Sequence, residues 1–171
     1  MEMMDLYDKN RQPLHETAVR GTELPKGKYR IVVHVCIFNE KDEMLIQQRQ
    51  SSKQMFPDLW DITAGGQVSA GETGAESAER ELAEELGIHI DMSDMRPMGT
   101  MNFKDGFDDV YLLRAEVDIS RLQLQKEEVQ AAKWASQEEI LRMIKNGEFI
   151  RYHESYIGLL FAMIDGDDTF S

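Results

Sequence analysis

The stretch that decides the fold runs from Gly66 to Ile88 and reads GQVSAGETGAESAERELAEELGI. Its second half predicts a helix from Gly74 to Leu86, because alanine and leucine recur there at spacings of three and four residues and form one apolar stripe. Thr73 and Glu76 have the spacing of a capping box, which begins a helix, and Gly87 suits the position that follows the last turn. The sequence therefore places a helix directly behind a glycine-containing loop.

Three glutamates share one face of this helix. Glu81, Glu84 and Glu85 stand at i, i+3 and i+4, so their carboxylates are neighbours. Such a group is either a solvated acidic face or a site for a divalent cation, since Mg²⁺ takes hard oxygen ligands from a few carboxylates and from substrate phosphates. The double glycine Gly65-Gly66 would let backbone groups approach a cation or a phosphate closely. The helix alone leaves both interpretations open.

The spacing of the whole stretch resembles a known motif. The Nudix box is Gly-x5-Glu-x7-Arg-Glu-U-x-Glu-Glu-x-Gly-U, in which U is an aliphatic residue. Its nine fixed positions are all matched, by Gly66, Glu72, Arg80, Glu81, Leu82, Glu84, Glu85, Gly87 and Ile88. Nine matches within 23 residues rarely coincide by chance, and the sequence is therefore identified as a member of the Nudix superfamily.

This resemblance implies a fold and a domain organisation. Nudix proteins are of the α/β (α+β) class and form an α/β/α sandwich around a mixed β-sheet. We expect residues 1–171 to form a single Nudix domain. Within it, residues 1–28 would be an N-terminal β extension and residues 165–171 a frayed tail.

The resemblance also implies a metal site. In the family, the positions of Glu81, Glu84 and Glu85 bind Mg²⁺ or Mn²⁺, and a backbone carbonyl at the position of Gly65 often joins them. A further acidic residue from a later loop often completes the site, and Glu128 is the first candidate here. Glu127 and the Asp108-Asp109 pair come next. The Arg80 position forms ion pairs that orient the box, and Glu72 is its expected partner.

The implied activity is hydrolysis. The substrate would be a nucleoside diphosphate linked to another moiety X, or a related small-molecule diphosphate. Cations at the diphosphate would neutralise its charge and lower the pKa of a bound water molecule. A carboxylate would act as general base for the attack of water on phosphorus. Glu84 and Glu81 are the first candidates for this base, followed by Glu128. The positive charges of Arg49 and Lys53 either grip the substrate phosphates or are ordinary surface charge.

Softer motifs outside the box resemble the isopentenyl-diphosphate isomerase-like branch of the family, among them Leu59–Thr63 and Trp134–Ser136. A true isomerase uses a cysteine and a metal-binding histidine just after the tryptophan-containing loop. Residues 64–67 hold neither, and the single cysteine, Cys36, lies in a predicted core strand. We therefore expect a hydrolase and keep the isomerase as an alternative. A non-catalytic, ligand-sensing module is a second alternative, against which the intact glutamates argue.

The charge composition limits the kinds of binding partner that the protein can have. Lys and Arg number 19 against 32 Asp and Glu, so the net charge is −13 and a nucleic-acid-binding or anionic membrane-binding surface is disfavoured. The first residues carry no signal-peptide pattern, and no apolar run approaches a membrane span. We expect a cytoplasmic protein that binds a small-molecule diphosphate, and a homodimer is the assembly to test because homodimers are the commonest oligomers.

The rest of the chain predicts strands and two further helices. Arg30 to Phe38 is so continuously apolar that it predicts a strand buried on both faces. A hairpin is expected near residues 6–14. Other expected strands are 44–49, 62–67 with an interruption at the double glycine, 98–103, 110–117 and 133–135, with an acidic loop at 105–109. Ser136 and Glu139 predict a second capping box, for a helix that ends at Asn146, and a last helix is expected over 155–165.

Overall fold

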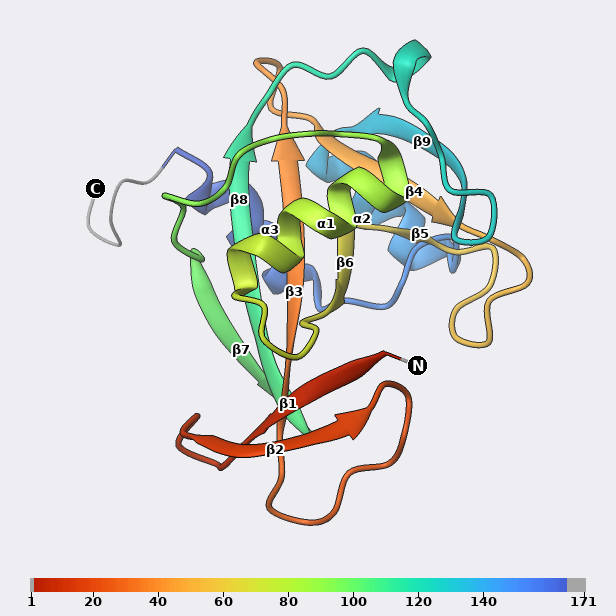
Figure 1. Ribbon diagram of the computed structural model, residues 1–171. Coiled ribbons are helices and arrows are strands. Elements are labelled where there is room, and N and C mark those ends of the chain that lie inside the picture. The colour runs from red at the N-terminus through yellow and green to blue at the C-terminus, as the bar shows by residue number, and fades with distance from the viewer. Residues whose placement is uncertain (1, 166–171) are drawn as a thin grey trace.

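The computed structural model describes residues 2–165. Its strands are β1 (Met3–Tyr7), β2 (Pro13–Val19), β3 (Arg30–Phe38), β4 (Met44–Arg49), β5 (Trp60–Asp61), β6 (Ala64–Gln67), β7 (Gly99–Phe103), β8 (Gly106–Arg114) and β9 (Val129–Ala135). Its helices are α1 (Gly74–Leu86), α2 (Gln137–Asn146) and α3 (Glu154–Met163), with a short 3-10 turn η1 (Ile119–Arg121). In Figure 1, α1 lies in front of the sheet and α2 and α3 lie behind it. This arrangement confirms the expected α+β sandwich with a mixed sheet.

Strand β3 organises the sheet. It pairs in parallel with β8 along its whole length and antiparallel with β6, and β7 extends this part of the sheet beyond β8. β3 also forms a hairpin with β4, but the two strands share only the pair Phe38 and Met44. Beyond that pair, β4 joins β5 and β9 instead. The sheet therefore splits after the hairpin, and the site described below lies where β3 and β4 separate.

The two faces of β3 pack against different helices. Ile31, Val33, Val35 and Ile37 are buried in one apolar cluster with the stripe of α1, formed by Ala78, Leu82 and Leu86. Cys36 and Phe38 are buried on the other face, in a second cluster with side chains of α2 and α3. Arg30, Val32 and His34 point to this second face but are only partly buried. The prediction of burial on both faces is thus correct for the second half of β3 and wrong for its first half.

Helix α1 has the predicted bounds and the predicted caps. The helix begins and ends at the predicted residues, the side chain of Thr73 accepts a hydrogen bond from the backbone N–H of Glu76, and the side chain of Glu76 accepts one from the backbone N–H of Thr73. Gly87 follows the helix with a φ of 69°, a left-handed conformation that favours glycine. At α2 only half of the predicted capping box forms. Ser136 accepts from the backbone N–H of Glu139, whereas the carboxylate of Glu139 binds Lys133 at 2.6 Å.

Several strand boundaries differ from the predicted ones because long-range pairing sets them. β8 begins at Gly106, opposite Arg30, and ends at Arg114, so most of the acidic segment 105–109 lies in a strand and not in a loop. The double glycine lies inside β6, which starts only at Ala64. β9 begins at Val129 and not at 133, and α3 covers Glu154–Met163 and not 155–165.

The N-terminal hairpin stands beside the main sheet. β1 and β2 pair antiparallel in a two-stranded sheet of their own, which lies near the beginning of β3 (Figure 1). Met4 and Leu6 are buried, and the backbone N–H of Tyr7 donates to the carbonyl of Tyr29 at 2.8 Å. The hairpin is therefore anchored to the body of the protein immediately before β3.

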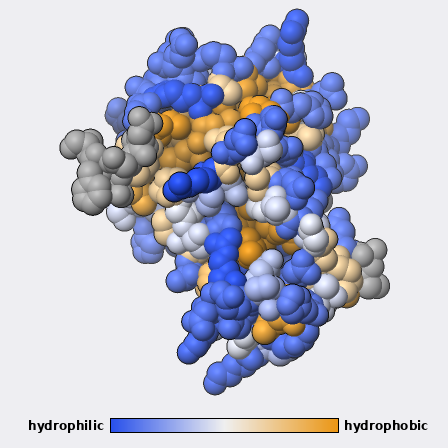
Figure 2. Space-filling view, turned by 60° about the vertical axis from the view of Figure 1, so that its left-hand side comes forward, coloured by the Kyte–Doolittle hydropathy of each residue, from blue (hydrophilic) through white to orange (hydrophobic). Residues whose placement is uncertain are grey.

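Hydrophilic side chains cover most of the face shown in Figure 2, with hydrophobic areas between them. This surface agrees with the high content of charged residues, 30% of the chain. Within residues 2–165, none of the helices has both the length and the apolar character needed to cross a membrane.

The hydrogen bond that caps α1 can be tested by mutation. Replacing Thr73 by Ala leaves the N–H of Glu76 without its acceptor, and we expect a loss of about 1 kcal/mol in the free energy of unfolding, measured with urea. Thr73→Ser keeps the hydroxyl and is the matched control. A Thr73→Ala variant as stable as the serine variant would contradict the assigned cap.

Candidate functional site

Gly66 and Glu81 lie in direct contact. A Cβ atom placed on Gly66 would stand 2.0 Å from Oε1 of Glu81, so only glycine leaves room for this carboxylate against β6. Gly66 is paired with Val33 of β3, which fixes its backbone in the sheet. The glycine at the start of the box therefore serves to bring the strand backbone and the first glutamate of the box together.

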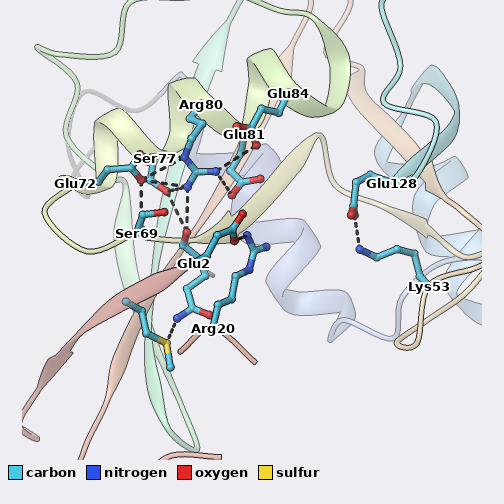
Figure 3. Close-up of polar contacts among 12 residues, drawn as sticks. Glu2, Arg20, Lys53, Ser69, Glu72, Ser77, Arg80, Glu81, Glu84 and Glu128 are labelled. Carbon is cyan, nitrogen blue, oxygen red and sulfur yellow. Dashed lines mark hydrogen bonds and ion pairs between the residues drawn. The ribbon is translucent and has the colours of Figure 1, made fainter. Parts of the chain in front are cut away.

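The guanidinium of Arg80 connects the loop, the helix and the strand (Figure 3). Its Nε and Nη2 donate to the two carboxylate oxygens of Glu72, at 3.0 and 3.1 Å. Nη1 donates to Glu81 at 2.9 Å, and Nη2 donates to the main-chain carbonyl of Gln67 at 3.2 Å. Burial alone would raise the pKa of Glu72, but the hydrogen bonds and the charge of Arg80 outweigh it and lower that pKa. The predicted partners Glu72 and Arg80 thus form a charged, bidentate pair.

The three glutamates of the helix differ in their environment. Glu81 and Glu85 are buried, whereas the side chain of Glu84 is 52% exposed and lies 3.4 Å from Arg80. Burial raises the pKa of Glu81, although the charge of Arg80 opposes this shift. Burial and then the charge of Glu81 raise the pKa of Glu85 to about 8, against a hydrogen bond of 2.7 Å from Nε2 of Gln47.

These residues suit a divalent cation in their chemistry. Two buried carboxylates that repel each other are stabilised by a cation between them, and carboxylate and carbonyl oxygens are the ligands that Mg²⁺ prefers. The arrangement is not yet a set of ligands. In the described part of the chain, no three His, Cys, Asp or Glu side chains converge so that they could hold a metal ion. Glu81 is held by Arg80, so its carboxylate would have to turn to bind one.

Glu128 and Lys53, predicted as a metal ligand and a phosphate ligand, bind each other. Nζ of Lys53 donates to Oε2 of Glu128, and Figure 3 shows this pair apart from the Arg80 network. The negative charge of Glu128 nevertheless contributes to the raised pKa of Glu85. The next candidates, Asp108 and Asp109, lie on opposite sides of β8: Asp108 faces His34, and Asp109 binds Arg11 at 2.8 Å.

A pocket of about 490 Å³ opens beside the glutamates, where β3 and β4 separate. Its lining comes from the six strands β3 to β8, from α1, and from the segment that follows β2. Arg49 lines it, and its Nε and Nη2 donate to the carbonyl of Met55 at 3.2 and 3.1 Å. Lys53 is not part of the lining. The residues that line the pocket are Arg20, Gly21, Arg30, Val32, His34, Gln47, Arg49, Asp61, Gly65, Gly66, Gln67, Glu85, Phe103 and Asp108.

His34, Gln47 and Asp61 line this pocket and were not predicted as site residues from the sequence. Nδ1 of His34 lies 2.7 Å from Oδ2 of Asp108, and the hydroxyl of Tyr152 donates to Asp61 at 2.8 Å. Burial raises the pKa of Asp61, although the charge of His34 opposes the shift. The signal that could have found Asp61 is a carboxylate within the otherwise apolar segment before the double glycine. Gln47, which holds Glu85, carried no such signal.

Comparison with known proteins places these features in a family. The model of the NUDIX domain matches residues 28–153. A protein from Listeria monocytogenes described as an uncharacterized Nudix hydrolase is 45% identical over 152 residues, which cover 89% of this chain and 90% of that protein. Nudix hydrolase 3 of Arabidopsis thaliana is 34% identical over 151 residues, which cover 81% of this chain and 20% of that protein.

Solved structures agree with the observed fold. A crystal structure of a Deinococcus radiodurans protein matches with a TM-score of 0.75 and 24% identity, and the match covers 93% of this chain and 99% of that one. A MutT protein from Methanosarcina mazei matches with a TM-score of 0.66 and 26% identity, over 85% of this chain and 99% of the other.

The pKa of Glu85 predicts how the stability of the metal-free protein depends on pH. Its pKa is about 8 in the folded protein and 4.5 as a reference for the unfolded chain, so the folded state binds more protons between these values. The contribution of Glu85 to the free energy of unfolding therefore falls as pH rises from 4.5 to about 8 and then levels off. Glu85→Gln removes this contribution, since the amide oxygen still accepts from Gln47.

We expect Glu85→Gln to exceed the wild type in stability at pH 8 by about 2–4 kcal/mol, in urea unfolding with chelator present. The advantage should shrink toward pH 5. Glu84→Gln, which changes the exposed glutamate of the same helix, should keep the wild-type slope. Parallel pH profiles for the Glu85→Gln variant and the wild type would show that Glu85 does not carry the shift.

Proposed function

The chain belongs to the Nudix family, and we propose that it is a hydrolase that uses Mg²⁺ or Mn²⁺ to cleave the diphosphate linkage between a nucleoside and a moiety X. The observation that carries this proposal is the complete glutamate box, in which Glu85 is buried at the wall of a pocket. A small-molecule diphosphate fits a pocket of this size. The family acts on diphosphate linkages, and the Listeria relative bears the name of a hydrolase.

Glu81, Glu84, Glu85 and the carbonyl of Gly65 would hold the metal. When bound, a divalent cation offsets the negative charge of the diphosphate and lowers the pKa of bound water. Gln47 keeps the carboxylate of Glu85 in place, whereas the carboxylate of Glu81 would turn from its contact with Arg80. Glu128 would join them after releasing Lys53.

Glu84 is the proposed general base. A base must accept a proton from the attacking water, and the carboxylate of Glu84 reaches solvent while its single contact with Arg80 is long, at 3.4 Å. Glu81 is the second candidate, but it is buried and bound by Arg80 at 2.9 Å. Glu128 is the third, and it is paired with Lys53.

Arg49 is the proposed ligand of a substrate phosphate. It lines the pocket, and its Nη1 lies 3.8 Å from Asp61, too far for a strong hydrogen bond. Nη1 can therefore donate to an anion while Nε and Nη2 stay on the carbonyl of Met55. Lys53 is a weaker candidate, because it lies outside the lining and its charge is matched by Glu128.

No observation favours the isomerase alternative. Cys36 is fully buried, and burial raises the pKa of its thiol well above the ordinary value, so it is not an acid or base for a substrate in the pocket. The relatives reported above are named hydrolases. The intact glutamates argue against the ligand-sensing module. Placement in the isomerase-like branch, a cytoplasmic location and a homodimer stay predictions from the sequence.

The glutamates can be tested directly. Glu84→Gln and Glu85→Gln should fold and yet lose at least about 100-fold in kcat/KM for metal-dependent diphosphate cleavage, since several kcal/mol of charge stabilisation would be removed. The assay is release of monophosphate or phosphate from a panel of nucleotides, nucleotide sugars, dinucleotides and isoprenoid diphosphates. Glu138→Gln, an exposed change on α2, is the matched control.

Two results would overturn the proposal. One is a wild-type protein that cleaves no member of the panel with Mg²⁺ or Mn²⁺. The other is an unchanged metal affinity in both glutamate variants, which would refute the site. Double-bond migration in isopentenyl diphosphate, followed by NMR, would establish the isomerase instead.

A further inference from the structure

The N-terminal hairpin is hydrogen-bonded to the loop of the glutamate box. The backbone N–H of Ala70 donates to the carbonyl of Met3 at 2.9 Å, and the backbone N–H of Gly71 donates to Oδ2 of Asp5 at 2.8 Å. Ala70 and Gly71 belong to the segment of the box between β6 and α1. The hairpin therefore has a fixed position beside the box, although it lies outside residues 28–153, which the NUDIX model matches.

Arg20 directly follows β2, where the hairpin meets the pocket. Its backbone N–H donates to the carbonyl of Glu2 at 2.9 Å, and the backbone N–H of Thr22 donates to the carbonyl of Val19 at 3.2 Å. These two bonds hold the backbone of Arg20 at the end of the hairpin. The side chain of Arg20 lines the pocket together with Glu85 of the box. The hairpin thus brings a cation to the glutamates.

The pair of Arg20 and Glu2 lies next to the Arg80 network, as Figure 3 shows. Burial raises the pKa of Glu81, and the charges of Arg80 and Arg20 oppose this shift. The hydrogen bond from Arg20 lowers the pKa of Glu2, and the charge of Arg80 adds to this effect. The two arginines and the two glutamates therefore form one cluster of mixed charge at the edge of the pocket.

Glu2 is a weak partner for Arg20. Nη1 of Arg20 donates to Oε2 of Glu2 at 2.6 Å, which is the one hydrogen bond that this side chain makes within residues 2–165. The two side chains are 43% and 64% exposed, and exposed pairs of this kind contribute little to stability. A guanidinium has five N–H donors in a planar fork that suits phosphate oxygens. Arg20 can therefore bind an anion in the pocket, with or without releasing Glu2.

The box itself has no cation to spare for a substrate. All three nitrogens of the Arg80 guanidinium already donate to acceptors within the box. Glu81 and Glu85 repel a diphosphate, so positive charge is needed beside them when one binds. The charge of Arg20 meets this need. The same charge acts against a divalent cation that binds near Glu81 without a diphosphate, because the two positive charges repel each other.

We propose that Arg20, which the N-terminal hairpin contributes, is a substrate-binding residue of the active site and donates hydrogen bonds to the phosphate oxygens of the diphosphate at the glutamate box. The inference rests on the proposed hydrolase function and adds a residue from outside the matched domain. It also couples two ligands. Arg20 disfavours the metal ion alone and favours the metal ion together with a diphosphate, so each of these ligands raises the affinity for the other.

A binding experiment tests this assignment without turnover. The probes are Mg²⁺ alone and methylenediphosphonate in the presence of Mg²⁺, an analogue whose P–C–P linkage is not hydrolysed, and both are measured by calorimetry. Arg20→Gln should lose about tenfold in affinity for the analogue, as expected for one charge-assisted hydrogen bond. It should bind Mg²⁺ alone at least as tightly as the wild type. Arg20→Lys should restore part of the affinity for the analogue.

Glu2→Gln separates substrate binding from a structural role of the ion pair. It breaks the same pair as Arg20→Gln but leaves the arginine in place, so it should bind the analogue at least as tightly as the wild type. Arg121→Gln, which changes an exposed arginine of η1, is the matched control and should bind like the wild type. Equal losses in Arg20→Gln and Glu2→Gln would show that Arg20 only fixes the hairpin, and would overturn the proposal.

Kinetics distinguish failure of this inference from failure of the hydrolase. For a substrate that the wild type cleaves, Arg20→Gln should lower kcat/KM by about tenfold, and Glu2→Gln should not lower it. An unchanged affinity of Arg20→Gln for the analogue, or no binding of the analogue by the wild type, would overturn the role of Arg20. If the wild type cleaves no substrate but the difference in analogue binding remains, only the hydrolase is overturned.

Discussion

The hydrogen bonds of the Arg80 guanidinium are the interaction on which the site depends. They join Glu72 in the loop, Glu81 in α1 and the main chain of Gln67 in β6. The backbone alone does not fix how these three segments lie relative to one another. A planar guanidinium can bind several acceptors at once, which a lysine ammonium cannot do in the same plane. Burying Glu81 without this partner would leave an uncompensated charge in the interior. The box is therefore a structural unit as well as a source of ligands.

The split of the sheet after the β3–β4 hairpin decides where a ligand can enter. α2 and α3 cover only the end of β3 that contains Cys36 and Phe38, so the other end keeps its second face accessible. The sequence carried a signal for this that the prediction of a fully buried strand did not use, since Arg30 and His34 are polar and lie on the uncovered part of that face. The capped ends of α1, by contrast, are set by residues within four positions of one another and were predicted correctly. The start of β8 was not predicted correctly, because it is set by the pairing of Gly106 with Arg30, which is a long-range contact.

In the site, too, features set by neighbouring residues were predictable and features set by long-range contacts were not. The spacing of Glu81, Glu84 and Glu85 along one helix is a local property, and it was readable from the chain. The approach of Lys53 to Glu128 depends on how two loops meet, so residues assigned separate roles turned out to be neighbours. The acceptors and cations that line the rest of the pocket come from five strands and from the end of the N-terminal hairpin. Their spacing along the chain follows no pattern from which the pocket could be predicted.

The position of Trp60 has a spectroscopic consequence. The protein has two tryptophans, Trp60 in β5 and Trp134 in β9, and both strands pair with β4. Nζ of Lys133 lies 4.9 Å from the centroid of the Trp60 ring, and Trp60 directly precedes Asp61 at the pocket wall. The two tryptophans therefore report on different sides of the sheet, because Trp134 packs against the cluster that contains α1 and Trp60 packs against the other cluster. Of the two, Trp60 adjoins a residue of the pocket wall, so its emission is the one expected to change on adding ligand, without any introduced dye.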